Sequence, residues 1–238
     1  MIVFASLTDK GERNINEDSI GAANDGLVGF FVLADGLGGH DKGEVASQLV
    51  VEQSMKHHAE FLGDIEGCFI HSQNHLIDEQ RRLNAVNEMK TTMVCLYIAD
   101  GKAAWGHVGD SRLYHFKNGK LAERTLDHSV PQMLVASGEI REKDICGHSD
   151  RNRLLRVMGM EWDVPKYVLG DPVGLTGKNV FLLCSDGFWE WTTTREMEKT
   201  LKKAATPESW LDSMKARIMK NGAGRNMDNF SAIAIFAD

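Results

Sequence analysis

Residues 93–125 read MVCLYIADGKAAWGHVGDSRLYHFKNGKLAERT, and this stretch largely decides the fold. Its apolar, β-branched and aromatic runs predict short strands over Met93–Ala99, Ala103–Val108, Arg112–Lys117 and Leu121–Thr125. Asp100-Gly101 separates the first two runs, and Asn118-Gly119 separates the last two. Asx-Gly pairs favour the tight turns of antiparallel hairpins. We therefore predict antiparallel neighbours rather than the crossover units of a parallel sheet.

The rest of the chain extends this pattern on both sides. Further strands are predicted over Ile2–Leu7, Ser19–Ala23, Leu27–Ala34, Val180–Cys184 and Phe230–Ala237, with Asp25-Gly26 as a third hairpin signal. Apolar residues at helical spacing predict helices over Lys42–Leu62, Ile65–Leu83, Thr194–Ala204 and Glu208–Met219. Strands at both ends with helices between them indicate an α+β fold, in which helices lie on the faces of antiparallel sheets.

Bulk composition excludes several classes of protein. The 238 residues are 42% hydrophobic and 26% charged, which is ordinary for a globular domain, and we expect one domain over residues 1–238. The net charge of −7 argues against a partner that is a nucleic acid or an anionic membrane. No two of the four cysteines are spaced as a zinc or redox pair, and no apolar run approaches a membrane span. We expect a cytoplasmic monomer without a regulatory or membrane domain.

Acidic residues stand where the predicted strands begin or end. The set is Asp35, Asp110, Asp186 and Asp228, with Glu17 and Asp18 just before another strand. In antiparallel sheets the end of one strand lies beside the start of the next, so these side chains can converge on one rim. A single aspartate after a strand is more often a turn residue, and that interpretation stays open for each of them. Carboxylates gathered at one rim would repel one another unless cations neutralised them.

Such a rim favours divalent cations that prefer oxygen ligands. With no cysteine and little histidine nearby, Mg²⁺ or Mn²⁺ is indicated rather than Zn²⁺. Two ions about 3.5–4 Å apart can activate a water for phosphoryl transfer. Such a site also needs an anion clamp and a proton donor. Arg13 can offer a bidentate guanidinium, and His40 has a pKa suited to proton donation, although alone each would be interpreted as a solvated or loop residue.

Short motifs follow one another along the chain. They are GERNINED (residues 11–18), ADGLGGH (34–40), VGDSR (108–112), DHS (127–129), NRLLRVMG (152–159), SDG (185–187) and DN (228–229). In order they resemble the PPM family, the type 2C metal-dependent protein phosphatases, in its bacterial form. The resemblance covers essentially the whole chain. It implies a β-sandwich of two antiparallel sheets flanked by pairs of α-helices, a four-layer α-β-β-α arrangement.

The resemblance also assigns roles to the acidic residues. It implies a first ion held by Asp35 and the Gly36 carbonyl, and a second held by Asp35, Asp186 and Asp228, with Glu17 reaching it at least through water. Asp18 would orient metal-bound water, and Asp110 with Asp186 would form a weaker third site. Arg13 would clamp the phosphate, and His40 corresponds to the general acid. Residues 131–151 would form a flap that touches the protein substrate.

The chain departs from the family pattern at Lys90-Thr91-Thr92, where Gly-Thr-Thr is common. Lys90 replaces a glycine in a turn before a strand, and because no metal ligand falls there, this replacement is not expected to affect the chemistry.

The function implied is metal-dependent hydrolysis of phosphoserine and phosphothreonine on partner proteins, opposing a bacterial serine/threonine kinase. Two alternatives stay open. A two-metal phosphodiesterase or nuclease is disfavoured by the acidic charge and the lack of a basic patch near the acids. A pseudophosphatase that only binds phosphoproteins would be expected to have lost a metal ligand, whereas Asp35, Asp186 and Asp228 are all present.

Overall fold

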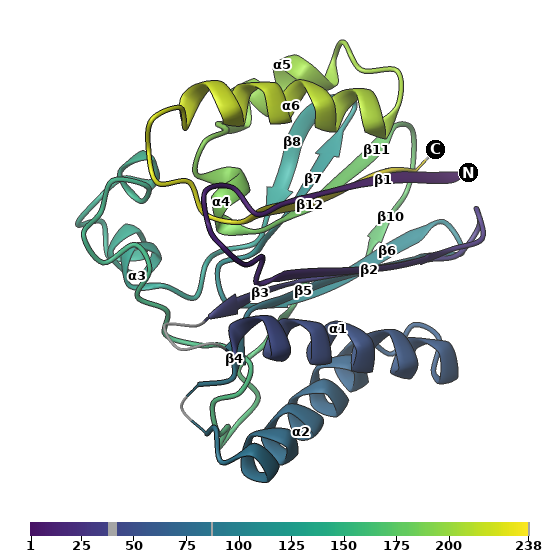
Figure 1. The fold of residues 1–238 in the computed structure, drawn as a ribbon. Coiled ribbons are helices and arrows are strands. Elements are labelled where there is room, and N and C mark those ends of the chain that lie inside the picture. Colours follow the sequence, from purple (N-terminus) through teal and green to yellow (C-terminus); the bar gives the residue numbers. More distant parts are fainter. Residues whose placement is uncertain (38–41, 87, 238) are drawn as a thin grey trace.

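Two antiparallel sheets pack face to face in the computed structural model, which describes residues 1–37, 42–86 and 88–237 (Figure 1). The first sheet has the order β1 (Ile2–Asp9), β12 (Phe230–Ala237), β11 (Asn179–Cys184), β7 (Arg112–Lys117) and β8 (Lys120–Arg124). The second has the order β10 (Val173–Gly174), β6 (Lys102–Val108), β5 (Met93–Ala99), β3 (Gly29–Leu37) and β2 (Asp18–Asn24). Short strands β4 (Lys90–Thr91) and β9 (Val168–Leu169) pair with β3 and β6.

A pair of helices covers the outer face of each sheet (Figure 1). The helices α1 (Gly43–Glu60) and α2 (Ile65–Leu83) lie on the second sheet, and α5 (Thr194–Leu201) and α6 (Pro207–Asn221) lie on the first. The smaller helices α3 (Val130–Ala136), η1 (Glu142–Asp144) and α4 (Asp186–Trp189) stand at one end of the sandwich. Among the residues described, no helix combines the length and apolarity needed to cross a bilayer. The predicted four-layer α+β sandwich is confirmed.

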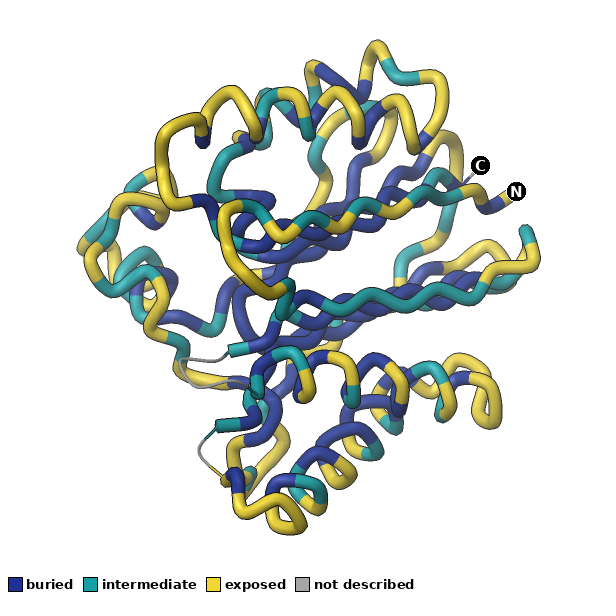
Figure 2. The backbone as a smooth tube through the Cα atoms, viewed as in Figure 1, coloured by how far each residue is buried: buried dark blue, intermediate teal, exposed yellow. Residues whose placement is uncertain are grey.

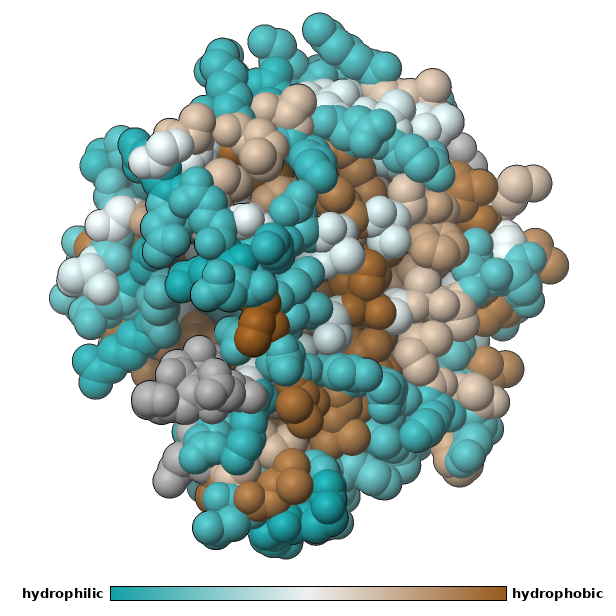
Figure 3. All heavy atoms as spheres, in the orientation of Figure 1, coloured by the Kyte–Doolittle hydropathy of each residue, from teal (hydrophilic) through white to brown (hydrophobic). Residues whose placement is uncertain are grey.

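Three hydrophobic layers separate the four structural layers. Successive residues of a strand point to opposite faces, so a strand buried on both faces is apolar throughout. In β3, Phe30 and Val32 pack toward α1 and α2, whereas Phe31 and Leu33 pack between the sheets. Figure 2 shows the resulting buried strands in dark blue beneath helices that keep an exposed outer face. In the space-filling view, hydrophobic residues also reach the surface between the two sheets (Figure 3).

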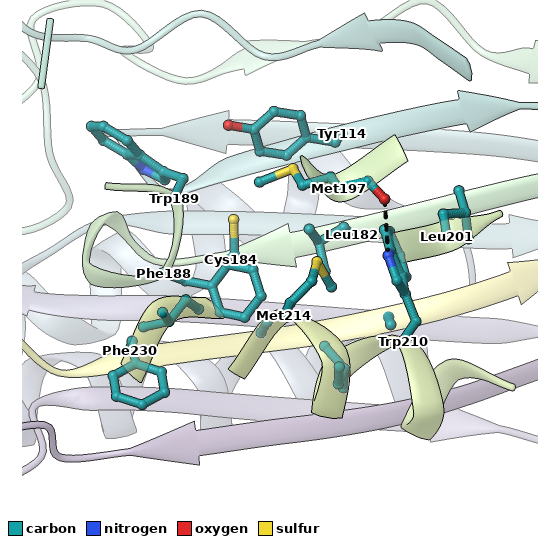
Figure 4. Close-up of a cluster of buried hydrophobic side chains, with 14 of the residues drawn as sticks. Tyr114, Leu182, Cys184, Phe188, Trp189, Met197, Leu201, Trp210, Met214 and Phe230 are labelled. Carbon is teal, nitrogen blue, oxygen red and sulfur yellow. Dashed lines mark hydrogen bonds between the residues drawn. The ribbon is translucent and has the colours of Figure 1, made fainter. Parts of the chain in front are cut away.

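The layer under α5 and α6 is rich in large side chains (Figure 4). Trp210 of α6 is fully buried there, and its indole Nε1 donates to the carbonyl oxygen of Met197 in α5 at 3.2 Å. That hydrogen bond satisfies the only polar atom of a large apolar side chain. Capping boxes at Thr193 and Thr206 begin the two helices.

The hairpin predictions are confirmed at two turns and need correction at the third. At Asp100-Gly101 and Asn118-Gly119 both central residues have positive φ, as a type I′ turn requires. At Asp25-Gly26 only Gly26 does, and the side chain of Asp25 accepts hydrogen bonds from the backbone of Leu27 and Val28. The connection is therefore a longer loop, and β3 begins at Gly29 rather than at Leu27.

The segment between β8 and β9 contains the predicted flap, and side chains secure it at both ends. Before it, Asp127 accepts two hydrogen bonds from Arg112, at 2.7 and 2.6 Å. After it, Gly159 donates to the side chain of Gln73 at 2.9 Å and accepts from Gln80 at 2.8 Å. Both glutamines belong to α2. The helices α3 and η1 inside this segment were not predicted from the sequence.

Candidate functional site

Acidic residues from both sheets meet at one end of the sandwich. Asp18 is the first residue of β2 and lies opposite Asp35 of β3 in the hairpin register. Asp228 precedes β12, Asp186 begins α4 directly after β11, and Asp110 lies in the connection from β6 to β7. Because β2 and β3 belong to one sheet and β11 and β12 to the other, the residues come together only where the two sheets pack.

A cleft of about 570 Å³ opens at this end. Its lining includes seven of the residues singled out from the sequence, namely Arg13, Glu17, Asp35, Gly36, Asp110, Asp186 and Asp228. The other described residues that line it are Asn14, Ile15, Leu37, Asn152, Leu154 and Asn229. Asp18 is buried directly behind the cleft. His40, the predicted general acid, lies outside the described residues.

The backbone of Asp35 is held by two threonines to which the sequence motifs assign no role. The backbone N–H of Asp35 donates to Thr92 Oγ1 at 2.9 Å. Its carbonyl oxygen accepts from Thr91 Oγ1 and from the Thr92 backbone, both at 2.8 Å. The hydroxyl of Thr92 also pairs with Ser111 beside Asp110, at 2.7 Å. The segment after Lys90 thus contains no acid but positions the backbone of one, and the expectation that Lys90 itself does not affect the chemistry stays a prediction.

A second set of hydrogen bonds positions Glu17 and Gly36. The Glu17 backbone N–H donates to the side-chain oxygen of Asn229 at 2.8 Å, and Gly36 donates to the Glu17 carbonyl at 3.1 Å. A Cβ atom on Gly36 would collide with the Gly43 carbonyl oxygen and would lie 2.8 Å from that of Glu17. Position 36 therefore accepts only glycine without movement of the backbone around it.

Four buried aspartates at this end of the sandwich have pKa values above the ordinary value. Burial raises the pKa of Asp18 to about 7, and the negative charges of Asp186 and Asp228 add to that rise despite hydrogen bonds from two serines. Burial, followed by repulsion from the neighbouring aspartates, also raises the pKa of Asp35 and of Asp110 well above the ordinary value. Burial and repulsion from Asp228 raise the pKa of Asp186. The repulsion among these buried negative charges is therefore relieved only when the carboxylates bind protons or cations.

The donor set fits divalent cations that prefer oxygen ligands. Asp18 Oδ1 is buried and has no hydrogen-bond partner among the described residues, which leaves its lone pairs unsatisfied. The other available donors are carboxylates and the Gly36 carbonyl, the ligands that Mg²⁺ and Mn²⁺ prefer. Within the described ranges, no three acidic, histidine or cysteine side chains already form a ready-made ion site. Cation binding would therefore need side-chain adjustment.

Among the described residues that line the cleft, Arg13 is the one with a positive charge. Its guanidinium donates to both carboxylate oxygens of Asp228, from Nε and from Nη2, each at 2.9 Å. This hydrogen-bonded ion pair raises the pKa of Arg13 further. Nearly half of the Arg13 side chain remains exposed to solvent. The planar group therefore lies at the mouth of the cleft, within reach of an anion that enters it.

Three comparisons connect this arrangement to known proteins. The sequence profile described as protein phosphatase 2C matches residues 10–131. The serine/threonine phosphatase stp of Listeria welshimeri is 34% identical over 207 residues, or 82% of this chain and 81% of that protein. The structure matches that of Stp1 from Staphylococcus aureus with a TM-score of 0.88, at 28% identity, over 100% of this chain and 96% of that one.

A further solved structure is the catalytic domain of the phosphatase PstP in complex with two manganese ions. It matches with a TM-score of 0.83 at 25% identity, over 100% of this chain and 99% of that one. The relationship inferred from the order of the short motifs is thus confirmed by sequence and by fold. The chain belongs to the protein phosphatase 2C family.

Proposed function

We propose that this chain hydrolyses phosphoserine and phosphothreonine in partner proteins, with two Mg²⁺ or Mn²⁺ ions and a weaker third, and that it opposes a serine/threonine kinase. The observation that carries the proposal is the set of carboxylates, contributed by both sheets, that lines one cleft with a guanidinium at its mouth. Manganese in the related PstP structure supports the choice of ion. Family membership supports the choice of a phosphomonoester substrate.

The proposed ligands are those that line the cleft. Asp35 and the Gly36 carbonyl would hold the first ion. The second would be held by Asp35, Asp186 and Asp228, with Glu17 reaching it at least through water. The weaker third would be held by Asp110 and Asp186. When bound, the ions supply the Lewis acidity that lowers the pKa of a water and neutralises phosphate oxygens. Asp228 would then exchange its contact with Arg13 for a contact with a cation.

The remaining residues act on the substrate and on water. Arg13, released from Asp228, has two parallel N–H donors for two phosphate oxygens. Asp18 lies opposite Asp35 with an unpartnered oxygen among the described residues, a position from which it can accept a hydrogen bond from a water and fix its orientation. The leaving alkoxide of serine or threonine needs a proton, and His40 is the proposed donor. Ile15 and Leu154 give the lining an apolar side for the substrate chain.

The test is hydrolysis of a phosphothreonine peptide by the purified protein, with and without Mn²⁺, beside Asp186→Asn. We expect turnover that requires the metal and is lost in the variant. An Arg13→Ala variant should keep metal binding and raise KM for the peptide, because the guanidinium contacts substrate rather than the ions.

Two results would contradict the proposal. Cleavage of single-stranded DNA in preference to the phosphopeptide would indicate a phosphodiesterase. Binding of the phosphopeptide with metal present but without turnover would indicate a pseudophosphatase. Calorimetric titration with Mn²⁺ separates the second case from a simple failure to bind metal.

A further inference from the structure

Three histidine side chains lie together where α1 and α2 pack, and none of them lines the catalytic cleft. His57 comes from the last turn of α1, and His71 and His75 come from α2. The ring centres of His57 and His71 are 5.2 Å apart, and those of His71 and His75 are 4.2 Å apart. His71 is thus the central ring, in contact with one neighbour on its own helix and one on the adjacent helix.

The spacing within α2 suits metal binding. Residues four apart lie on the same face of a helix, one turn above the other. Zinc binds imidazole nitrogen at about 2.0–2.1 Å, so two rings that share an ion have centres roughly 5 Å apart. The distance of 5.2 Å matches this value, whereas 4.2 Å is shorter, so His71 and His75 must separate slightly to share an ion.

Hydrogen bonds already fix two of the rings in the way that metal-binding histidines require. A ligating histidine usually donates its other ring N–H to a carboxylate or a backbone carbonyl. His75 Nδ1 lies 3.0 Å from the His71 carbonyl oxygen, which leaves Nε2 as the free nitrogen. His57 Nε2 lies 3.1 Å from the Asp64 carboxylate, which leaves Nδ1. Burial, followed by the neighbouring histidines, lowers the pKa of His71, which favours the neutral ring that binds metal.

The packing around the cluster keeps the two helices close. A side chain on Gly67 would collide with Asp64 and with His57 Nε2, so glycine at this position lets α2 approach the end of α1. The neighbouring charges are Lys56, Glu60 and Asp64. The two acids favour a cation in this part of the surface, and Lys56 opposes it.

We propose that His57, His71 and His75 form a second metal site, selective for ions that prefer nitrogen ligands, such as Zn²⁺, Ni²⁺ or Cu²⁺. It differs in ligand chemistry from the carboxylate cluster, which suits Mg²⁺ and Mn²⁺. No three such side chains in the described ranges already converge on one point, so the central ring, His71, must turn about its side-chain torsions to share an ion with its two neighbours. An ion bound there links α1 to α2 and stabilises the folded state by an amount that rises with the logarithm of the free ion concentration above Kd.

The first test is calorimetric titration of the purified protein with Zn²⁺ in the presence of excess Mg²⁺, which occupies the oxygen-ligand sites. We expect one additional zinc per chain, and an affinity at least tenfold lower in His71→Ala/His75→Ala. His57→Gln should also weaken binding. The matched control is Asn74→Ala, which changes an exposed residue of the same helix and should titrate as the parent does. Unchanged zinc affinity in the double variant, or in His57→Gln, would overturn the proposal.

A second measurement needs no variant, so it does not depend on how the substituted chains fold. Paramagnetic Cu²⁺ broadens the nuclear magnetic resonance signals of nearby nuclei. Added in substoichiometric amounts to the Mg²⁺-bound protein, it should first broaden the ring signals of His57, His71 and His75, and should leave the buried His115 sharp. Selective broadening of other histidines, or of none, would contradict the site.

Discussion

Asp18 lies directly across the β2–β3 hairpin from Asp35, and it also accepts a hydrogen bond at 2.8 Å from Oγ of Ser185, the residue that follows β11 of the opposite sheet. One buried carboxylate thus joins the two halves of the sandwich at the floor of the cleft. Burial of such a group is unfavourable unless its charge is neutralised. The fold therefore keeps a destabilising arrangement at the place where the proposed chemistry occurs, and the first two predictions follow from it.

Asp186→Asn should stabilise the protein in chelator while abolishing its activity. The substitution removes one of several mutually repelling carboxylates, so the melting temperature without metal should rise by a few degrees. Differential scanning calorimetry with EDTA and with Mn²⁺ measures both states. The parent should gain much more stability from Mn²⁺ than the variant does. A variant that is less stable than the parent in EDTA would show that repulsion does not dominate the cluster.

The metal-free protein should show a pH dependence that is traceable to Asp18. Its pKa is about 7 in the folded chain and near 3.9 when unfolded, so the folded state holds more protons between these values. Its contribution to stability is therefore lost as the pH rises from about 4 to about 7. Urea unfolding in EDTA should show Asp18→Asn more stable than the parent at pH 8, by on the order of a few kcal/mol, with the difference shrinking at pH 5. A difference independent of pH would contradict this.

Thr92→Val should reduce turnover while leaving the fold intact. The change removes the acceptor for the Asp35 N–H and the contact with Ser111, and its cost in unfolding free energy should be about 1–3 kcal/mol. We expect kcat to fall at least tenfold because Asp35 loses its fixed position. Thr92→Ser keeps the hydroxyl and should restore most of the rate. Equal rates in the valine variant and the parent would remove Thr92 as a positioning residue.

His40→Ala tests a residue outside the described part of the chain. A general acid matters most for a poor leaving group, so hydrolysis of an alkyl phosphate such as phosphothreonine should fall far more than hydrolysis of an aryl phosphate. Steady-state kinetics on both substrates with saturating Mn²⁺ makes the comparison. Equal losses on the two substrates would assign the proton to another donor.

The strands and main helices were predictable because their signals are local. The hairpins at Asp100-Gly101 and Asn118-Gly119 require residues that tolerate positive φ, and β5, β7, β12 and α2 have the predicted limits. The convergence of acids from both sheets followed from the antiparallel arrangement. The two-residue stretches β4, β9 and β10 were missed because they depend on pairing with distant strands rather than on their own sequence.

Two functional features were beyond the reach of sequence patterns. The role of Thr91 and Thr92 depends on the position of Asp35, 57 residues before Thr92, and a threonine beside a strand has no sequence signature of its own. The pairing of Arg13 with Asp228 joins residues 215 positions apart. The signal that could have pointed to Thr91 and Thr92 was their place in a stretch that aligns with a family motif.

The fastening of the flap segment at both ends has a consequence for how such proteins diversify. Arg112 fixes the start of the segment by its hydrogen bonds to Asp127. Gln73 and Gln80 fix its end by their hydrogen bonds to Gly159, so both ends are held outside the carboxylate cluster. Away from Asn152 and Leu154, which line the cleft, its length and sequence can change between these points without moving the carboxylates. Preference for a target protein can then evolve separately from the residues that hydrolyse the phosphate. A loop transplanted from a relative should transfer that relative's target preference and leave the hydrolytic activity intact.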